Sequence, residues 1–147
     1  MNNLNERPLE VLLVEDNPGD VLLVQKALKK STINVNLHIV NDGTEAMIYL
    51  KNNDPQSTGN IPNLILLDLN LPTKGGHEVL KEVKGDLRLK QIPIVIVTTS
   101  QDQSDIHNCY QNHANCYITK PIEVDDYFTM IDEVTRFWGS FVNLPAN

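Results

Sequence analysis

The sequence lacks the features of several large classes of protein. No apolar run approaches the ~20 residues of a membrane-spanning helix, and the first residues, MNNLNERP, have no apolar stretch typical of a signal peptide. The only cysteines, Cys109 and Cys116, are therefore expected to be reduced thiols. A formal net charge of -7 argues against nonspecific nucleic-acid binding, which needs clustered Lys and Arg. We expect a cytoplasmic protein that binds neither membrane nor nucleic acid.

The length and composition of the chain are sufficient for one folded domain. The chain has 147 residues, of which 41% are apolar and 21% charged, and it shows no internal repeat or low-complexity run. We expect residues 1–8 to be a flexible tail and residues 9–147 to form a single domain. The polar stretch 51–62 is longer than most connections in a compact domain, so we expect a mobile surface loop there.

Short apolar runs alternate with amphipathic segments along the chain. The runs predict strands at 9–14, 35–40, 64–67, 93–98 and 116–119. The segments predict helices at about 18–30, 43–50, 79–85, 102–112 and 124–142, the fourth with Ile106, Cys109, Tyr110 and His113 facing inward. Five such alternations predict an α/β fold, a doubly wound (βα)5 sandwich with a flavodoxin-like parallel sheet in the order 2-1-3-4-5.

Carboxylates follow two neighbouring strands of this predicted sheet. The central run 64–67 stops at Asp68, and the run 9–14 ends at Glu15 and Asp16. Ligands bind outside the carboxyl ends of parallel strands, and three converging carboxylates favour a divalent cation such as Mg²⁺. Thr98 and Lys120, which end the fourth and fifth strands, add a hydroxyl and an ammonium group. These groups match the requirements of phosphoryl transfer, which are positioning and charge neutralisation.

Each of these residues also has a purely structural explanation. Asp68 is a common residue at the start of a turn, and Asp16 or Asn17 suits a helix N-cap that precedes a proline in the first turn. Thr98 is a β-branched strand residue, and Lys120 could be a solvated charge. The chemical interpretation is favoured because all four features lie at one edge of the predicted sheet.

The set Glu15-Asp16, Asp68 in LLDLNLP, Thr98 in IVTTS and Lys120-Pro121 resembles the receiver domain of two-component response regulators. The resemblance spans about residues 10–142. It implies that Asp68 accepts a phosphoryl group from a phosphohistidine on a sensor histidine kinase. It implies no enzyme with a separate substrate, but a signalling protein that assists its own phosphorylation and dephosphorylation.

The resemblance also implies roles for individual residues. Those expected to hold Mg²⁺ or Mn²⁺ are Glu15, Asp16, Asp68 and the backbone carbonyl of Asn70. Lys120 would bond a phosphate oxygen, Thr98 and Tyr117 would form the switch pair, and the Lys120–Pro121 peptide would be cis. The chain departs from the commonest receiver pattern at Gly75-Gly76-His77, which puts the local turn in question.

A narrower resemblance lies in the loop around Pro55, the stretches TTS and NCYITKP, and the FW and LP near the end of the chain. These are similar to response regulators of cyanobacterial phytochromes, which implies a phytochrome-type kinase as partner. We expect a stand-alone receiver, because no DNA-binding or enzymatic segment follows it, so output must pass through protein contacts.

The last predicted helix suggests where those contacts lie. About 19 residues span roughly 28 Å, against roughly 17 Å for a five-residue strand, so the helix should extend past the sheet. Phe137, Trp138 and Phe141 would form an apolar contact surface there. We expect a homodimer through the fourth helix, the fifth strand and the last helix. The alternative is that these rings fold back onto the chain's own end around Leu144.

Three other functions fit parts of the sequence. A haloacid-type phosphatase would need a second Asp where Asn70 stands, and a flavin-binding protein would need a Ser/Thr/Gly-rich loop where the acidic EDNPGD lies. A structural zinc site could be drawn from His107, Cys109, His113 and Cys116. Buried, apolar cysteines account better for that segment.

Overall fold

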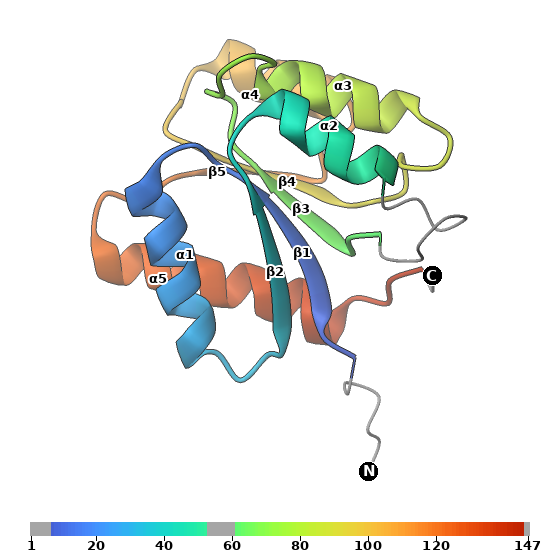
Figure 1. Cartoon of the computed structure of the whole chain (residues 1–147). Helices are drawn as coiled ribbons and strands as arrows, with labels where there is room; N and C mark the ends of the chain where they lie inside the picture. Colours follow the sequence, from blue (N-terminus) through green and yellow to red (C-terminus); the bar gives the residue numbers. More distant parts are fainter. Residues whose placement is uncertain (1–6, 53–60, 146–147) are drawn as a thin grey trace.

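The computed structural model describes residues 7–52 and 61–145, in which strands and helices alternate along the chain (Figure 1). The elements are β1 (Leu9–Val14), α1 (Pro18–Lys30), β2 (Val35–Val40), α2 (Gly43–Asn52), β3 (Leu64–Leu67), α3 (Gly76–Gly85), β4 (Ile94–Thr98), α4 (Gln103–Gln111), β5 (Cys116–Thr119), α5 (Val124–Arg136) and the π-helical segment η1 (Phe137–Phe141). Apart from η1, each was predicted from the sequence with small differences at the ends. Most of the predicted tail and loop, residues 1–6 and 53–60, lies outside the described residues.

The five strands form one parallel sheet in the order β2-β1-β3-β4-β5, which confirms the predicted doubly wound fold. Figure 1 shows α2, α3 and α4 on one face of the sheet and α1 and α5 on the other. The direction of winding reverses between β1 and β3, so the carboxyl ends of these two strands lie side by side.

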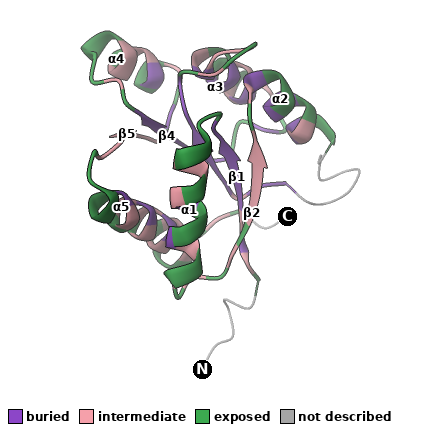
Figure 2. Ribbon diagram, turned by 60° about the vertical axis from the view of Figure 1, so that its left-hand side comes forward, coloured by how far each residue is buried: buried purple, intermediate pink, exposed green. Residues whose placement is uncertain are grey.

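Successive residues of the central strands contribute to different halves of the core. Leu12 and Ile65 pack with α2 and α3, while Val11 and Leu64 pack with α1 and α5. All four side chains are fully buried, as are most residues of β1, β3 and β4 (Figure 2). The edge strand β2 is only half-buried, in agreement with its alternating sequence. The central strands are thus fixed on both faces, and their ends are rigid supports for side chains.

Helix α4 differs from its prediction at its carboxyl end. Of the positions expected to face inward, Cys109 is buried and Ile106 half-buried, whereas Tyr110 and His113 are exposed. The reason is that the helix ends at Gln111 and His113 adopts a left-handed φ of 71°. The helical period therefore does not extend to His113, and Ala114 is buried in its place.

The C-terminal segment folds partly back onto the domain. Trp138 and Leu144 are both half-buried and pack against the half of the core that lies beneath α1 and α5. A Cβ on Gly139 would lie 2.9 Å from the Ile33 side chain, so the backbone of η1 approaches the domain closely. Phe137 and Phe141 remain 51% and 77% exposed. The predicted apolar surface is therefore reduced to two of its three rings.

No helix in residues 7–52 and 61–145 is long and apolar enough to cross a membrane.

Candidate functional site

Three carboxylates converge at the adjacent ends of β1 and β3. Backbone hydrogen bonds from Glu15 to Val40 and from Asp68 to Val14, both 3.1 Å, extend the ladders to these two residues. Glu15 and Asp68 are buried, and Asp16 is exposed. One oxygen of each carboxylate lies within 4.8 Å of the others. The predicted convergence is confirmed, and the oxygen donors are of the type and spacing that a divalent cation needs.

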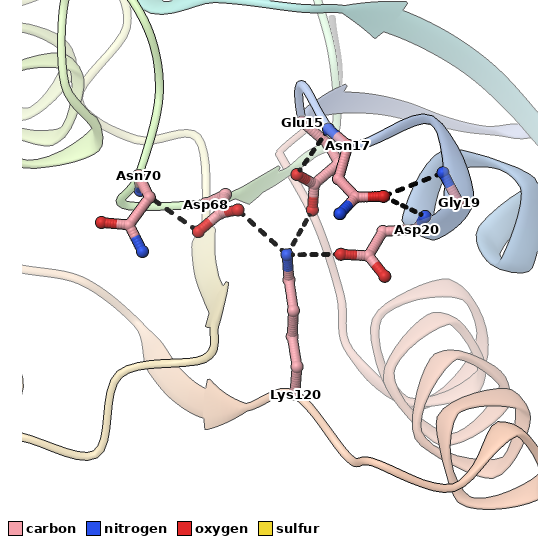
Figure 3. A network of polar contacts seen from close by, with 7 residues as sticks. All are labelled: Glu15, Asn17, Gly19, Asp20, Asp68, Asn70 and Lys120. Carbon is pink, nitrogen blue, oxygen red and sulfur yellow. Dashed lines mark hydrogen bonds and ion pairs between the residues drawn. The ribbon is translucent and has the colours of Figure 1, made fainter.

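The ammonium group of Lys120 reaches this cluster from the end of β5 (Figure 3). Its Nζ donates to Glu15 Oε1 at 2.6 Å, to Asp20 Oδ2 at 2.8 Å and to Asp68 Oδ2 at 2.9 Å. Only 7% of the Lys120 side chain is exposed, which excludes the solvated charge considered from the sequence. The sequence reasoning missed Asp20, whose only signal was an acidic residue in the first turn of a predicted helix after Pro18.

The cluster carries more negative charge than Lys120 can neutralise. Burial raises the pKa of Glu15 to about 7; the nearby charge of Asp68 adds to this effect, and Lys120 opposes it. Burial by itself would lower the pKa of Lys120, but the hydrogen bonds to Asp20, Glu15 and Asp68 outweigh it and raise that pKa. Lys120 is therefore a permanent cation, and the excess of carboxylates favours a bound divalent metal.

The loop after β1 both caps a helix and positions the acids. Asn17 Oδ1 accepts hydrogen bonds from the amides of Gly19 at 2.9 Å and Asp20 at 3.1 Å, while the Asn17 amide donates to Glu15 Oε2 at 3.2 Å (Figure 3). Asn17, not Asp16, is therefore the N-cap. The cap interpretation of this segment is confirmed, and the cap leaves Asp16 free for the acidic cluster.

The loop after β3 holds Asp68 through its backbone. The Asn70 amide donates to Asp68 Oδ1 at 3.3 Å. Gly76 lies against the same strand end, where a Cβ would be 2.2 Å from the carbonyl oxygen of Asp68. Its amide donates to the carbonyl of Leu69 at 3.0 Å. The glycine in the unusual Gly75-Gly76-His77 segment thus allows α3 to begin directly against the Asp68 backbone.

Thr98 and Tyr117 lie on the neighbouring strands β4 and β5. Thr98 is fully buried, and its Oγ1 has no hydrogen-bond partner in the described part of the chain. The Tyr117 hydroxyl donates to the carbonyl of Ser100 at 3.0 Å, and burial raises the pKa of this phenol. A buried hydroxyl without a partner is unusual, and it is suited to a ligand that arrives later.

One alternative that the sequence analysis disfavoured is absent, and one expectation is wrong. His107, Cys109, His113 and Cys116 do not form a metal-binding group within residues 7–52 and 61–145. Cys109 is instead buried, and burial raises the pKa of its thiol to about 11. The Lys120–Pro121 peptide is not cis, since no cis bond occurs in the described ranges. The trans form is the ordinary lower-energy form of a bond before proline.

Comparison with known proteins agrees with this geometry. The family model described as "Response regulator receiver domain" matches residues 11–132. The response regulator Rcp1 of Synechocystis sp. is 45% identical over 146 residues, 99% of both chains. The solved structure of the phosphorylated cyanobacterial phytochrome response regulator RcpA has a TM-score of 0.88 and 44% identity, covering 95% of this chain and 100% of its own.

A relative also supports the expected binding of a divalent metal. The solved Mn²⁺-bound form of Rcp1 has a TM-score of 0.86 and 47% identity, and it covers 95% of this chain and 100% of its own. The cluster of Glu15, Asp16 and Asp68 fits a divalent metal in this chain. With five parallel strands in the order 2-1-3-4-5 and a family match over most of its length, this chain belongs to the response regulator receiver domain family.

Proposed function

We propose that Asp68 is the residue of this receiver that accepts the phosphoryl group, with a phosphohistidine of a sensor histidine kinase as donor. The supporting observation is the position of its carboxylate, 6% exposed, 2.9 Å from Lys120 Nζ and within 4.8 Å of the oxygens of Glu15 and Asp16. Asp68 thus combines an acceptor oxygen, a contact with a fixed cation and neighbouring metal-ligand oxygens in one place.

The transfer itself requires little covalent chemistry from the protein. An oxygen of Asp68 forms a bond to phosphorus while the phosphorus–nitrogen bond of the phosphohistidine breaks and the imidazole leaves. Lys120 neutralises charge on the transferred oxygens, and the free Oγ1 of Thr98 donates to one of them. The same groups would assist hydrolysis of the aspartyl phosphate by an incoming water.

A divalent cation would supply additional neutralisation of the phosphoryl charge. Glu15, Asp16 and Asp68 would hold it, together with the backbone carbonyl of Asn70. The acidic loop after β1 disfavours a flavin phosphate. Asn70 cannot act as the general acid that a haloacid-type phosphatase requires.

Intact mass spectrometry after incubation with acetyl phosphate and Mg²⁺ tests the acceptor. We expect the wild type to gain one phosphate and Asp68→Asn to gain none. Asp125→Asn, on the exposed surface of α5, is the matched control and should gain one phosphate as the wild type does. Modification of Asp68→Asn, or none in the wild type, would refute the assignment.

We also propose a phytochrome-type kinase as the donor, and a cytoplasmic location in which that kinase has ATP. Support comes from the identity of 45% to Rcp1 and 44% to RcpA, the second described as a cyanobacterial phytochrome response regulator. The test is transfer of labelled phosphate from a phosphorylated cyanobacterial phytochrome, compared with an unrelated histidine kinase. Equal transfer rates from the two kinases would contradict the proposal of a phytochrome-type kinase as the donor.

Output would pass through a homodimer formed by α4, β5 and α5, with η1 at its margin. Exposed apolar side chains occur on or next to these elements: Tyr110, Ile122, Val124, Phe137 and Phe141. Trp138 is half-buried against the core and contributes less to this surface. We expect Phe137→Glu combined with Phe141→Glu to shift the protein to a monomer in sedimentation experiments. A wild type that sediments as a monomer at tens of micromolar, phosphorylated or not, would exclude the dimer.

A further inference from the structure

Asp20 is a carboxylate of the site that does not belong to the predicted metal ligands. It lies in the first turn of α1, and its Oδ2 accepts a hydrogen bond from Lys120 Nζ at 2.8 Å (Figure 3). Asn17 provides the N-cap of this helix, so the Asp20 side chain is not needed for capping. Its contact with Lys120 connects Asp20 instead to the surroundings of Asp68.

The ammonium group of Lys120 has as many carboxylate acceptors as it has protons. It carries three N–H donors, and it contacts Glu15, Asp20 and Asp68 at 2.6, 2.8 and 2.9 Å. A phosphoryl oxygen that bonds to Lys120 must therefore replace one of these contacts. The side chains of Glu15 and Asp68 are 3% and 7% exposed, whereas that of Asp20 is 21% exposed. Asp20 is thus the acceptor most open to the solvent.

The charge of Asp20 also acts on Asp68 at short range. Because an oxygen of each carboxylate contacts the same nitrogen, the two oxygens cannot be further apart than the sum of those contacts, about 5.7 Å. This is less than the Debye length of roughly 8 Å at physiological ionic strength, so salt screens the repulsion only in part. Burial raises the pKa of the Tyr127 phenol of α5, and the charge of Asp20 adds to that effect. An anionic group attached to Asp68 would feel the same charge.

We propose that Asp20 weakens the binding of phosphoryl-type anions at Asp68, because it shares the Lys120 ammonium group and adds a negative charge beside it. Asp20 is a positioning residue, since it acts through Lys120, and the inference rests on the proposed function of Asp68. The same negative charge attracts a divalent cation. Removal of this charge therefore changes the affinities for anion and metal in opposite directions.

Beryllofluoride, a mimic of the phosphoryl group, tests the effect on the anion. In saturating Mg²⁺, we expect Asp20→Asn to bind it about fivefold or more tightly than the wild type, as followed by fluorine NMR. The amide oxygen can still accept from Lys120, so this variant removes the charge and keeps the hydrogen bond. Asp126→Asn, which removes an exposed acid from the first turn of α5, is the matched control and should not change the affinity.

Mg²⁺ alone supplies a measurement that a merely structural role would not move in the same way. In calorimetric titrations without the anion, we expect Asp20→Asn to bind Mg²⁺ about twofold or more weakly than the wild type. If Asp20 only supports the start of α1, the melting temperature of the variant falls and its beryllofluoride affinity does not rise. An anion affinity that does not rise, or a metal affinity that does not fall, refutes the inference.

Further variants separate this inference from the proposed function. If Asp20→Asn does not fold by circular dichroism, Asp20→Ser takes its place with the same expected changes. Wild type that binds no beryllofluoride, or Asp68→Asn that binds it as well as the wild type, overturns the proposed function and this inference with it. Binding that is lost in Asp68→Asn but not strengthened in Asp20→Asn refutes only the role of Asp20.

Discussion

Glu15 should make the metal-free protein less stable as the pH rises toward neutrality. Its pKa is raised from 4.5 to about 7 in the folded state, first by burial. Below pH 4.5 the carboxyl is protonated in both states, so it has no effect. Between the two values the folded protein keeps a proton that the unfolded chain has lost, and the free energy of unfolding falls as the pH rises. At 1.36 kcal/mol per unit, the loss is on the order of 3 kcal/mol and is complete above about pH 7.

The variant Glu15→Gln should abolish this dependence, since its amide does not titrate and its oxygen can still accept from Lys120. In EDTA, we expect the free energy of unfolding of the variant, relative to that of the wild type, to rise by on the order of 3 kcal/mol between pH 5 and pH 8. Urea unfolding followed by circular dichroism at several pH values measures the difference. Asp105 and Glu82 do not interfere with this test. Their pKa values are lowered in the folded state, so the stability that they contribute is lost only as the pH falls below their ordinary values of 3.8 and 4.5.

Two comparisons make this test specific. Glu78→Gln, at an exposed position of α3, should follow the wild-type pH dependence. Mg²⁺ should remove the pH dependence of the wild type near neutrality, because the metal binds Glu15 in its ionised form, and should change the variant much less. Parallel curves for wild type and Glu15→Gln from pH 5 to 8 in EDTA would refute the reasoning.

Three further predictions concern the supports of the site, each measured by urea unfolding in EDTA at pH 8. Lys120→Met leaves buried carboxylates without their cation and should cost roughly 3–5 kcal/mol; an unchanged midpoint would contradict this. Gly76→Ala should cost more than about 2 kcal/mol because its Cβ would meet the Asp68 carbonyl, whereas Gly85→Ala, in open space, should stay within about 1 kcal/mol. Asn17→Ala removes a cap with two hydrogen bonds and should cost about 1 kcal/mol; equal stability would show that water replaces the cap.

The strands, their order and the main site could be predicted because their signals are local. The runs 9–14 and 64–67 are continuously apolar and end in acids, so their burial on two faces and the position of Glu15 and Asp68 follow from sequence. Once the sheet order is known, the convergence of these ends requires no further information. Lys120 could be placed at the same edge for the same reason.

The features that could not be predicted from the sequence depend on how individual side chains are oriented in the fold. Asp20 reaches Lys120 because the cap at Asn17 directs the first turn of α1 toward the sheet, which its residue type does not encode. Trp138 packs against the core while its neighbour Phe137 stays exposed, in a segment where the α-helix gives way to η1. The contact between His77 and Asp105 joins residues 28 positions apart, so no local pattern could reveal it.

If Asp68 is the acceptor, as proposed, the charge imbalance around it would supply energy for switching. Before phosphorylation, Lys120 is shared among three carboxylates. Esterification of Asp68 would replace one negative charge by a group of nearly two, so Lys120 would be drawn toward the phosphoryl oxygens and its bonds to Glu15 and Asp20 would weaken. The amide of Lys120 donates to the carbonyl of Thr98 at 2.7 Å, and the strand that ends just before it carries Tyr117. We expect a shift of Lys120 to reach both residues of the predicted switch pair through this strand end.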